Sequence, residues 1–460
     1  MNSPSAIVVF DIGKTNKKIL VFDEDYRILH QESVQFEESI DEDGDPCEDI
    51  AELTAWITSS FETLLDDERF TIQAVNFSAY GASLVFVDET LEPVLPLYNY
   101  LKPYPPELQD IFYSSYGGQK EFAKETASPA LGSLNSGLQL YRLKIERPEL
   151  FDRVKYALHL PQYLSSIISK HACSEITSIG CHTNLWGFRN GRYHEWVENE
   201  RVHQKLAPIF PSNHCFAIYH QGRTIKVGVG MHDSSAALLP YLTNIEQPFV
   251  LLSTGTWCIS MNPFNTLPLT TYELMNDCLC YLAHDGRPIK ASRLFTGHLH
   301  EKESKRLSRF FNQPMESVGE LRYSQQSEEK VFMYINQIRH GNFDGKQFGF
   351  EKRDLSEFSE FSEAYHQLLI DIVARQLIST GLIQGSPKAG KIIINGGFSR
   401  NDIYMNLMAA VFPDTKIYSA SLAEASALGA AMVIHSHWNT RPLQASHIQF
   451  KHYPDATKIA

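Results

Sequence analysis

The chain has 460 residues, of which 43% are hydrophobic and 21% are charged. This composition is typical of a globular protein, and the length exceeds what one ordinary core accommodates, so we expect two domains. The formal net charge of −13 would repel a phosphate backbone, which argues against nucleic acid as a partner but not against a small anionic ligand. No signal peptide or membrane-spanning run is apparent, so we expect a cytoplasmic protein without membrane contact.

The seven cysteines stand at positions 47, 173, 181, 215, 258, 278 and 280. Their number is odd and their spacing matches neither a disulfide framework nor a zinc site, so we expect mostly buried, unpaired thiols. Aromatic residues make up 12% of the chain. That share leaves room for the apolar interface of a homodimer, although no stretch identifies one.

The first predicted elements are a buried strand, a polar turn and a second strand within residues 6–22, AIVVFDIGKTNKKILVF. Asp11, just before the turn, is an oxygen ligand of the kind that Mg²⁺ prefers. The turn itself carries a glycine, a hydroxyl, an amide and two lysines, groups that bind phosphate oxygens: Gly13, Lys14, Thr15, Asn16 and Lys17. An ordinary polar hairpin turn is the alternative interpretation.

Other phosphate-binding and nucleotide-binding motifs are missing. The first turn is not a Walker loop, because Val8 stands where a P-loop has its first glycine and the chain returns into a strand. Protein-kinase signatures are absent. The GVG of residues 228–230 is not a dinucleotide fingerprint, since Asp233 takes the place of its last glycine.

An acidic stretch at residues 36–49, FEESIDEDGDPCED, is expected to be a solvated loop before a helix that runs from near Ile50 through Leu65. A second strand–turn–strand follows, in which Gly81 would let a ligand hydroxyl approach the main chain. A plain hairpin is the alternative. Residues 93–106 form an irregular segment whose Tyr100 and Lys102 would line a sugar pocket or simply pack.

Near the middle of the chain, an apolar strand ends in glycines at residues 227–233, VGVGMHD, and a run of small residues follows it. The pattern predicts close backbone approach and then a helix start, where His232 and Asp233 are presented together. Asp233 is the candidate catalytic residue. A helix N-cap is its alternative role.

The second half begins with a similar pattern, FVLLSTGTWCISMNP at residues 249–263, in which Gly255 falls opposite Gly13. Gly255 and Thr256 would form a second phosphate-facing turn, without charge. Similar spacing in the two halves indicates a duplicated domain that faces itself across a cleft. The expected boundaries of the two lobes are residues 1–242 and 243–460.

Further along, a long helix is predicted from Glu357 to Ile383, followed by a strand, a glycine pair and a helix in KIIINGGFSRNDIYMN. Gly396 and Gly397 would clear space for a flat ring or a ribose against the main chain. The small-residue helix LAEASALGAAMVI is expected to pack behind this glycine turn.

Five segments together resemble the FGGY family of carbohydrate kinases. They are DIGKTNKK, the strand–turn around Gly81, GVGMHDSSAA, STGTW, and NGGFSRNDIYMN with its AEASALGAA helix. Their order and spacing match across nearly the whole chain. Within the family, QLYRLKIERPELFDRVKYALHLPQYL and LSTGTW look most like rhamnulokinases and L-fuculokinases, which phosphorylate 6-deoxy ketohexoses.

The resemblance implies an α/β class protein with a duplicated actin-like ATPase (ribonuclease H-like) fold, two lobes and a cleft between them. It also implies ATP-dependent phosphorylation of a sugar, with Asp233 as the general base and Asp11 placing Mg²⁺. The implied substrate contacts are Gly81, His232 and Ser234. The implied ATP contacts are Lys14, Thr15, Asn16, Lys17, Gly255, Thr256, Gly396, Gly397 and Asn401.

Two departures from the family pattern leave the sugar open. LYNYLKPYPP stands where related deoxysugar kinases carry an Arg-containing motif, and the substrate-side asparagine of the family is replaced within KASRLF. The leading expectation is a 6-deoxy-L-ketohexose, L-fuculose or L-rhamnulose, with a pentulose or polyol as the alternative. A catalytically silent sugar-binding regulator and a chaperone-type or filament ATPase are the competing hypotheses, and the presence of Asp11 with Asp233 argues against the regulator.

Overall fold

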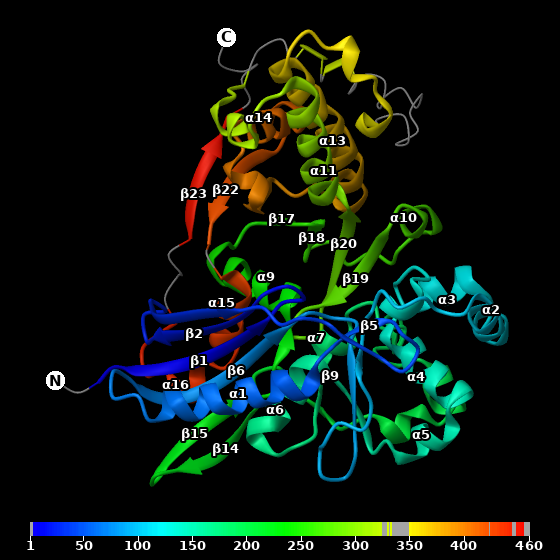
Figure 1. Cartoon of the computed structure of the whole chain (residues 1–460), viewed down its shortest axis with the longest axis vertical. Helices are drawn as coiled ribbons and strands as arrows, with labels where there is room; N and C mark the ends of the chain where they lie inside the picture. Colours follow the sequence, from blue (N-terminus) through cyan, green and yellow to red (C-terminus); the bar gives the residue numbers. More distant parts are fainter. Residues whose placement is uncertain are drawn as a thin grey trace.

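The computed structural model describes residues 3–323, 329–330, 332–333, 349–422, 424–443 and 448–454. It shows two lobes, each built on a mixed β-sheet (Figure 1). The first sheet has the order β14-β15-β6-β1-β2-β3, with β16 beside β6. Its strands are β1 (Ser5–Ile12), β2 (Lys17–Asp23), β3 (Ile28–Val34), β6 (Thr71–Ala79), β14 (Cys215–His220), β15 (Arg223–Gly228) and β16 (Met231–His232).

The second sheet has the order β19-β20-β18-β17-β21-β22-β23. Its strands are β17 (Phe249–Thr254), β18 (Cys258–Asn262), β19 (Cys278–Leu282), β20 (Pro288–Leu294), β21 (Lys391–Gly396), β22 (Lys416–Ser421) and β23 (Gln449–Tyr453). In each sheet the first hairpin, β1–β2 or β17–β18, lies beside a parallel strand, β6 or β21. The predicted duplication is therefore confirmed, and Gly13 and Gly255 occupy the same turn of the two hairpins.

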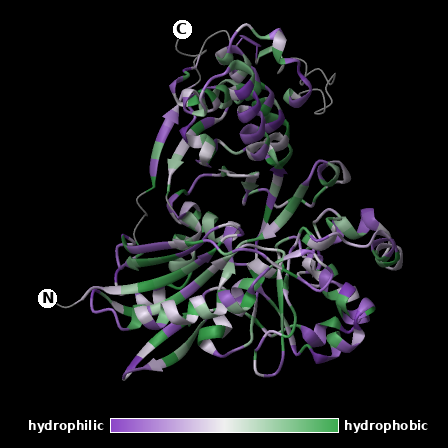
Figure 2. Ribbon diagram, in the orientation of Figure 1, coloured by the Kyte–Doolittle hydropathy of each residue, from purple (hydrophilic) through white to green (hydrophobic). Residues whose placement is uncertain are grey.

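Successive residues of a strand point to opposite faces of the sheet, and the central strands are apolar on both faces. Helices therefore cover the sheets. On one face of the first sheet lie α1 (Ile50–Leu65) and α6 (Leu160–Ser169), and the outer face of the second sheet is covered by α13 (Phe361–Ile383) and α14 (Asp402–Val411). Figure 2 shows the hydrophobic colour concentrated on the central strands. Within the described ranges, no helix has the length and apolar character of a membrane span.

Helix α9 (Asp233–Asn244) lies between the two sheets. Its Ala236 and Leu239 pack into a core with the first sheet, whereas Leu238 and Tyr241 pack into a core with the second. Helix α15 (Ala425–Val433), near the end of the chain, packs against α9 and the first sheet. The expectation that this helix packs behind the glycine turn at residues 396–397 is thus wrong, because its small-residue face fits the backbone of α9.

A set of smaller helices extends from the first lobe and builds its own core around aromatic side chains. The members are α2 (Pro106–Ser115), α3 (Gln119–Glu125), α4 (Ser136–Glu146), α5 (Pro148–Arg153) and α8 (Glu195–Asn199). Two further helices are α7 (Ile176–Ile179) and α11 (Thr296–Phe311).

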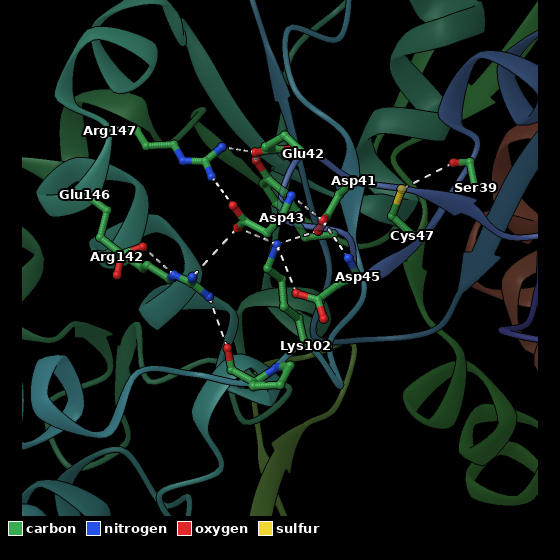
Figure 3. A network of polar contacts seen from close by, with 12 residues as sticks. Ser39, Asp41, Glu42, Asp43, Asp45, Cys47, Lys102, Arg142, Glu146 and Arg147 are labelled. Atoms are coloured by element: carbon green, nitrogen blue, oxygen red, sulfur yellow. Dashed lines mark hydrogen bonds and ion pairs between the residues drawn. The ribbon is translucent and has the colours of Figure 1, made fainter.

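The acidic stretch is not the solvated loop that we expected. Asp41 is buried, and the Nζ of Lys102 lies 2.5 Å from its Oδ2 and 2.8 Å from the Oδ2 of Asp43 (Figure 3). Arg147 binds Glu42 and Asp43 from the end of α4. The segment therefore folds onto counter-charges. Its short strands β4 (Ser39–Ile40) and β5 (Pro46–Glu48) pair with each other, and β5 pairs with β8 (Leu97–Tyr98) of the segment that follows β7 (Leu84–Val87). Lys102 is buried in this cluster of carboxylates, in line with the alternative that it simply packs.

The contact between α9 and α15 is closest at Gly429, where an added Cβ would stand 1.9 Å from the carbonyl oxygen of Ala236. We expect Gly429→Ala to destabilise the protein by about 1–3 kcal/mol, because the overpacked helices must move apart. Thermal unfolding should show a lower midpoint. The matched control is Gly381→Ala in α13, where nothing lies within 4 Å and alanine should stabilise by up to about 1 kcal/mol. Equal midpoints for the two variants would contradict this packing argument.

Candidate active site

The carboxyl ends of three neighbouring strands meet at one edge of the first sheet. Strand β6 is parallel to both β1 and β16, and its Ser78 lies opposite Asp11 on one side and Met231 on the other. Asp233 directly follows β16, and Gly81 lies two residues after the end of β6. Residues predicted from distant parts of the sequence are therefore brought to the same edge.

Asp233 is the first residue of α9, and the N-cap position is His232, so the alternative role of Asp233 as the helix cap is wrong. Its Oδ1 lies 2.5 Å from the amide nitrogen of Ser234, 3.2 Å from the Ser234 hydroxyl and 3.2 Å from the Nε2 of His232. Burial raises its pKa to about 6, although 34% of the side chain remains exposed. No lysine or arginine of the described chain pairs with it, so the carboxylate is free to accept a proton.

His232 is neutral near pH 7, because burial lowers its pKa to about 3. The hydroxyl of Ser235 donates to the carbonyl of Leu282 and lies 3.3 Å from the Nδ1 of His232. The bond network therefore assigns the ring hydrogen to Nδ1 and makes Nε2 an acceptor. The thiol of Cys181 lies 3.1 Å from that Nε2.

Gly81 is a point of close approach, but the neighbours are side chains of the protein. An added Cβ would lie 2.4 Å from the Sγ of Cys181 and 3.1 Å from the ring of His232. The side-chain direction at Gly81 is thus filled by protein atoms, and its expected contact with a ligand hydroxyl would use the main chain. Glycine is needed there because Cys181 and His232 pack against its backbone.

Asp11 lies near Asp233. Burial raises the pKa of Asp11 to about 6 against a hydrogen bond from Ser426, and the charge of Asp233 adds to the rise. Two carboxylates that repel each other favour a bound cation, and Mg²⁺ commonly takes one or two carboxylates and completes its shell with water and phosphate oxygens. Asp11 and Asp233 are carboxylates of the kind that this mode uses; no larger group of His, Cys, Asp or Glu side chains that could hold a metal ion occurs in the described ranges.

The turn between β1 and β2 holds its two lysines against carboxylates. The Nζ of Lys17 lies 3.0 Å from Glu48, and the Nζ of Lys14 lies 3.3 Å from Glu48 and 2.9 Å from Glu38. Glu48 is buried and also accepts a hydrogen bond of 2.8 Å from Tyr80. Glu48 therefore orders both predicted phosphate-binding lysines, and the sequence reasoning did not identify it.

The tips of the two hairpins are open. Thr15 and Asn16 are exposed in the first turn, and Gly255 and Thr256 in the second. Helix α11 begins against the second turn, where the amide of His298 donates to the carbonyl of Thr256 over 3.1 Å. Main-chain and hydroxyl groups of both turns are thus available to a ligand.

The remaining predicted nucleotide contacts follow β21, at the carboxyl edge of the second sheet. Gly396 has a φ of 92°, and a Cβ there would lie 2.0 Å from the carbonyl oxygen of Thr254, whereas a Cβ at Gly397 would lie 3.8 Å from that oxygen. Asn401 is the N-cap of α14 and accepts from the amide of Tyr404. Its side-chain amide donates to the hydroxyl of Tyr365, so its observed role is structural.

Two family models match most of the chain. The N-terminal domain of the FGGY family of carbohydrate kinases matches residues 6–232, and the carbohydrate kinase FGGY C-terminal domain matches residues 246–442. A comparison with curated proteins gave no match.

Solved structures give the same fold. A carbohydrate kinase from Novosphingobium aromaticivorans is 22% identical, with a TM-score of 0.74 over 97% of this chain and 96% of that chain. A xylulose kinase and a gluconate kinase from Lactobacillus acidophilus are each 13% identical, with TM-scores of 0.77 and 0.75 over 99% of this chain and 94% of theirs. The chain belongs to the FGGY family of carbohydrate kinases and has the two-lobed, actin-like ATPase fold of that family.

Proposed function

We propose that this kinase transfers the γ-phosphoryl group of ATP to a hydroxyl of a ketose, with Asp233 as the general base. One observation carries the assignment. Asp233 is a carboxylate without a cationic partner in the described chain, at the strand edge that also holds Asp11, and its pKa is raised to about 6. A base whose pKa lies near the working pH is ionised at that pH and still accepts a proton readily.

In the proposed reaction, the sugar oxygen attacks the γ-phosphorus, its proton passes to Asp233, and the bond to the departing ADP breaks. Once protonated, Asp233 can donate to the Nε2 of His232, which lies 3.2 Å away and has no hydrogen of its own. His232 would therefore stabilise the protonated base. Ser234 would hold the carboxylate in place through its amide and hydroxyl.

The two hairpin turns would align the phosphates. Lys14 and Lys17 supply charge, and the other proposed contacts supply amide and hydroxyl donors: Thr15, Asn16, Gly255 and Thr256. Gly397 would face the adenosine, and Gly396 and Asn401, which contact Thr254, Tyr404 and Tyr365, would support this surface. Bound Mg²⁺, held by Asp11, would neutralise phosphate charge.

For the sugar, we propose a 6-deoxy-L-ketohexose, L-fuculose or L-rhamnulose. The support is the likeness of residues 139–164 and of LSTGTW to rhamnulokinases and L-fuculokinases. A pentulose is the alternative, which the fold likeness to a xylulose kinase favours. The test is ADP release with Mg²⁺ and ATP against L-fuculose, L-rhamnulose, D- and L-xylulose, D- and L-ribulose, D-fructose, glycerol and D-gluconate. No sugar-dependent release, with ATP still bound, would favour a silent sugar-binding regulator.

Replacement of the base should remove chemistry and keep binding. We expect Asp233→Asn to lower kcat by about 100- to 10,000-fold, because the sugar proton loses its acceptor. The affinity for ADP, measured by calorimetry, should stay unchanged. Asp110→Asn, at an exposed position in α2, is the control and should match the wild type. Turnover that persisted in Asp233→Asn would show that another group accepts the proton.

The pH profile should report the two carboxylates. Asp233 and Asp11, both with a pKa raised to about 6, lose their charge as the pH falls below that value, and a protonated base cannot accept the sugar proton. We therefore expect kcat/KM to rise with pH through about 6 and to level off above it. His232, with a pKa of about 3, stays neutral across this range. A flat profile between pH 5 and 8 would contradict the assignment.

A further inference from the structure

Arg293 lies near the carboxyl end of β20, in the KASRLF segment that departs from the family pattern. Its side chain is 7% exposed. The Nη2 donates to the Oδ1 of Asp277 over 2.7 Å, and the guanidinium carbon lies 5.3 Å from the ring centroid of Trp257. The guanidinium is thus fixed between one carboxylate and one aromatic ring, and Trp257 directly follows the second hairpin turn.

Most of the hydrogen-bonding capacity of Arg293 is unused. Its Nε is buried without a partner, and among the described residues no hydrogen bond reaches Nη1. Asp277 keeps 36% of its side chain exposed, and Trp257 keeps 40% of its surface exposed. A guanidinium has five donors and does not lose its charge, so a buried one with unused donors beside exposed polar surface is suited to a polar ligand.

Arg293 is in the electrostatic neighbourhood of the base. Burial raises the pKa of Cys181, and the charge of Asp233 adds to that rise while the charge of Arg293 opposes it. Burial also raises the pKa of Tyr281, and the charges of Asp233 and Arg293 change that pKa in the same two directions. The ring centroid of Tyr281 is 5.3 Å from that of His232. Cys181 and Tyr281 pack in one core with Ile289 and Ala291 of β20, the strand that carries Arg293, and both contact His232.

The charges of the side chains near Asp233 and Arg293 favour an uncharged substrate. Asp233, Asp11 and Asp277 are acidic, and Arg293 is already paired with Asp277. His232 and His182 are neutral, since burial lowers the pKa of each to about 3, with the charge of Arg293 adding to the effect at His182. A substrate carboxylate would meet a net negative site. A sugar hydroxyl, which donates and accepts, would match a donor beside an acceptor.

We propose that Arg293 and Asp277 together bind a hydroxyl group of an uncharged sugar, and that Arg293 is a specificity-determining residue of the kinase. The inference rests on the proposed function and deepens it, because it excludes aldonates from the substrate class. Trp257 would keep the guanidinium plane in place beneath the sugar. The phosphorylated hydroxyl would be at Asp233, and the bound hydroxyl at another carbon of the same molecule.

The test combines variants of the protein with variants of the sugar. The proteins are the wild type, Arg293→Met, Arg293→Lys and Asp277→Asn. The sugars are the neutral member of the panel with the highest kcat/KM, its mono-deoxy analogues, and D-gluconate. Arg353→Met is the matched control, because it breaks another arginine–aspartate pair of the same lobe, that of Arg353 with Asp371 on α13.

We expect Arg293→Met to raise the sugar KM by about 10- to 100-fold, the loss typical of one hydrogen bond to a charged group. One mono-deoxy analogue should show the same loss with the wild type and no further loss with Arg293→Met. Arg293→Lys should recover part of the affinity, and Asp277→Asn should raise KM for the parent sugar but not for that analogue. The affinity for ADP without sugar should be unchanged in all variants.

Three results would overturn the inference. In the first, every analogue loses the same factor in the wild type and in Arg293→Met. In the second, Arg353→Met reproduces the pattern of Arg293→Met. In the third, D-gluconate is the preferred substrate. If the wild type phosphorylates no sugar, the proposed function fails, and calorimetric binding of the same neutral sugars and D-gluconate to wild type and Arg293→Met then decides the inference by the same criteria.

Discussion

Helix α9 contacts both sheets at once, and this double contact fixes the position of the base. Ala236 and Leu239 pack toward the first sheet, and Leu238 and Tyr241 toward the second. Because side chains three and four positions apart share a helix face, one short helix can serve two cores. Its first residue is Asp233, so any rotation of one lobe against the other would act on the helix that carries the proposed base.

The sequence was informative where structure is local. Apolar runs broken by a polar turn predicted both hairpins, and the spacing of Gly13 and Gly255 predicted their equivalence, which the shared strand order confirms. The helix expected from near Ile50 through Leu65 has those bounds in the structure. Asp11 and Asp233 were singled out because each stands at the end of an apolar strand beside a turn or helix start and within a family-like segment, and the fold brings the two together.

The sequence was silent where contacts join distant segments. Glu48 lies within an acidic run, and nothing in that run distinguishes it from the other acidic residues before the fold brings Lys14, Lys17 and Tyr80 to it. The same limit explains the error over the acidic loop, whose counter-charge, Lys102, comes from another segment. A small-residue helix fits any close partner, so its pattern could not select α9. The free donors of Arg293 are likewise a property of its surroundings.

The pairing of the two lysines with Glu48 affects how strongly the kinase without nucleotide binds anions from solution. A turn whose cations already carry a buried counter-ion offers little net charge, so a lone phosphate or sulfate has little to gain by displacing Glu48. In the proposed ATP complex, a metal-bound polyphosphate would bring several oxygens to the lysines at once and would also engage the amides of two hairpins. Binding would then be an exchange of counter-ions, which would favour nucleotides over simple salts.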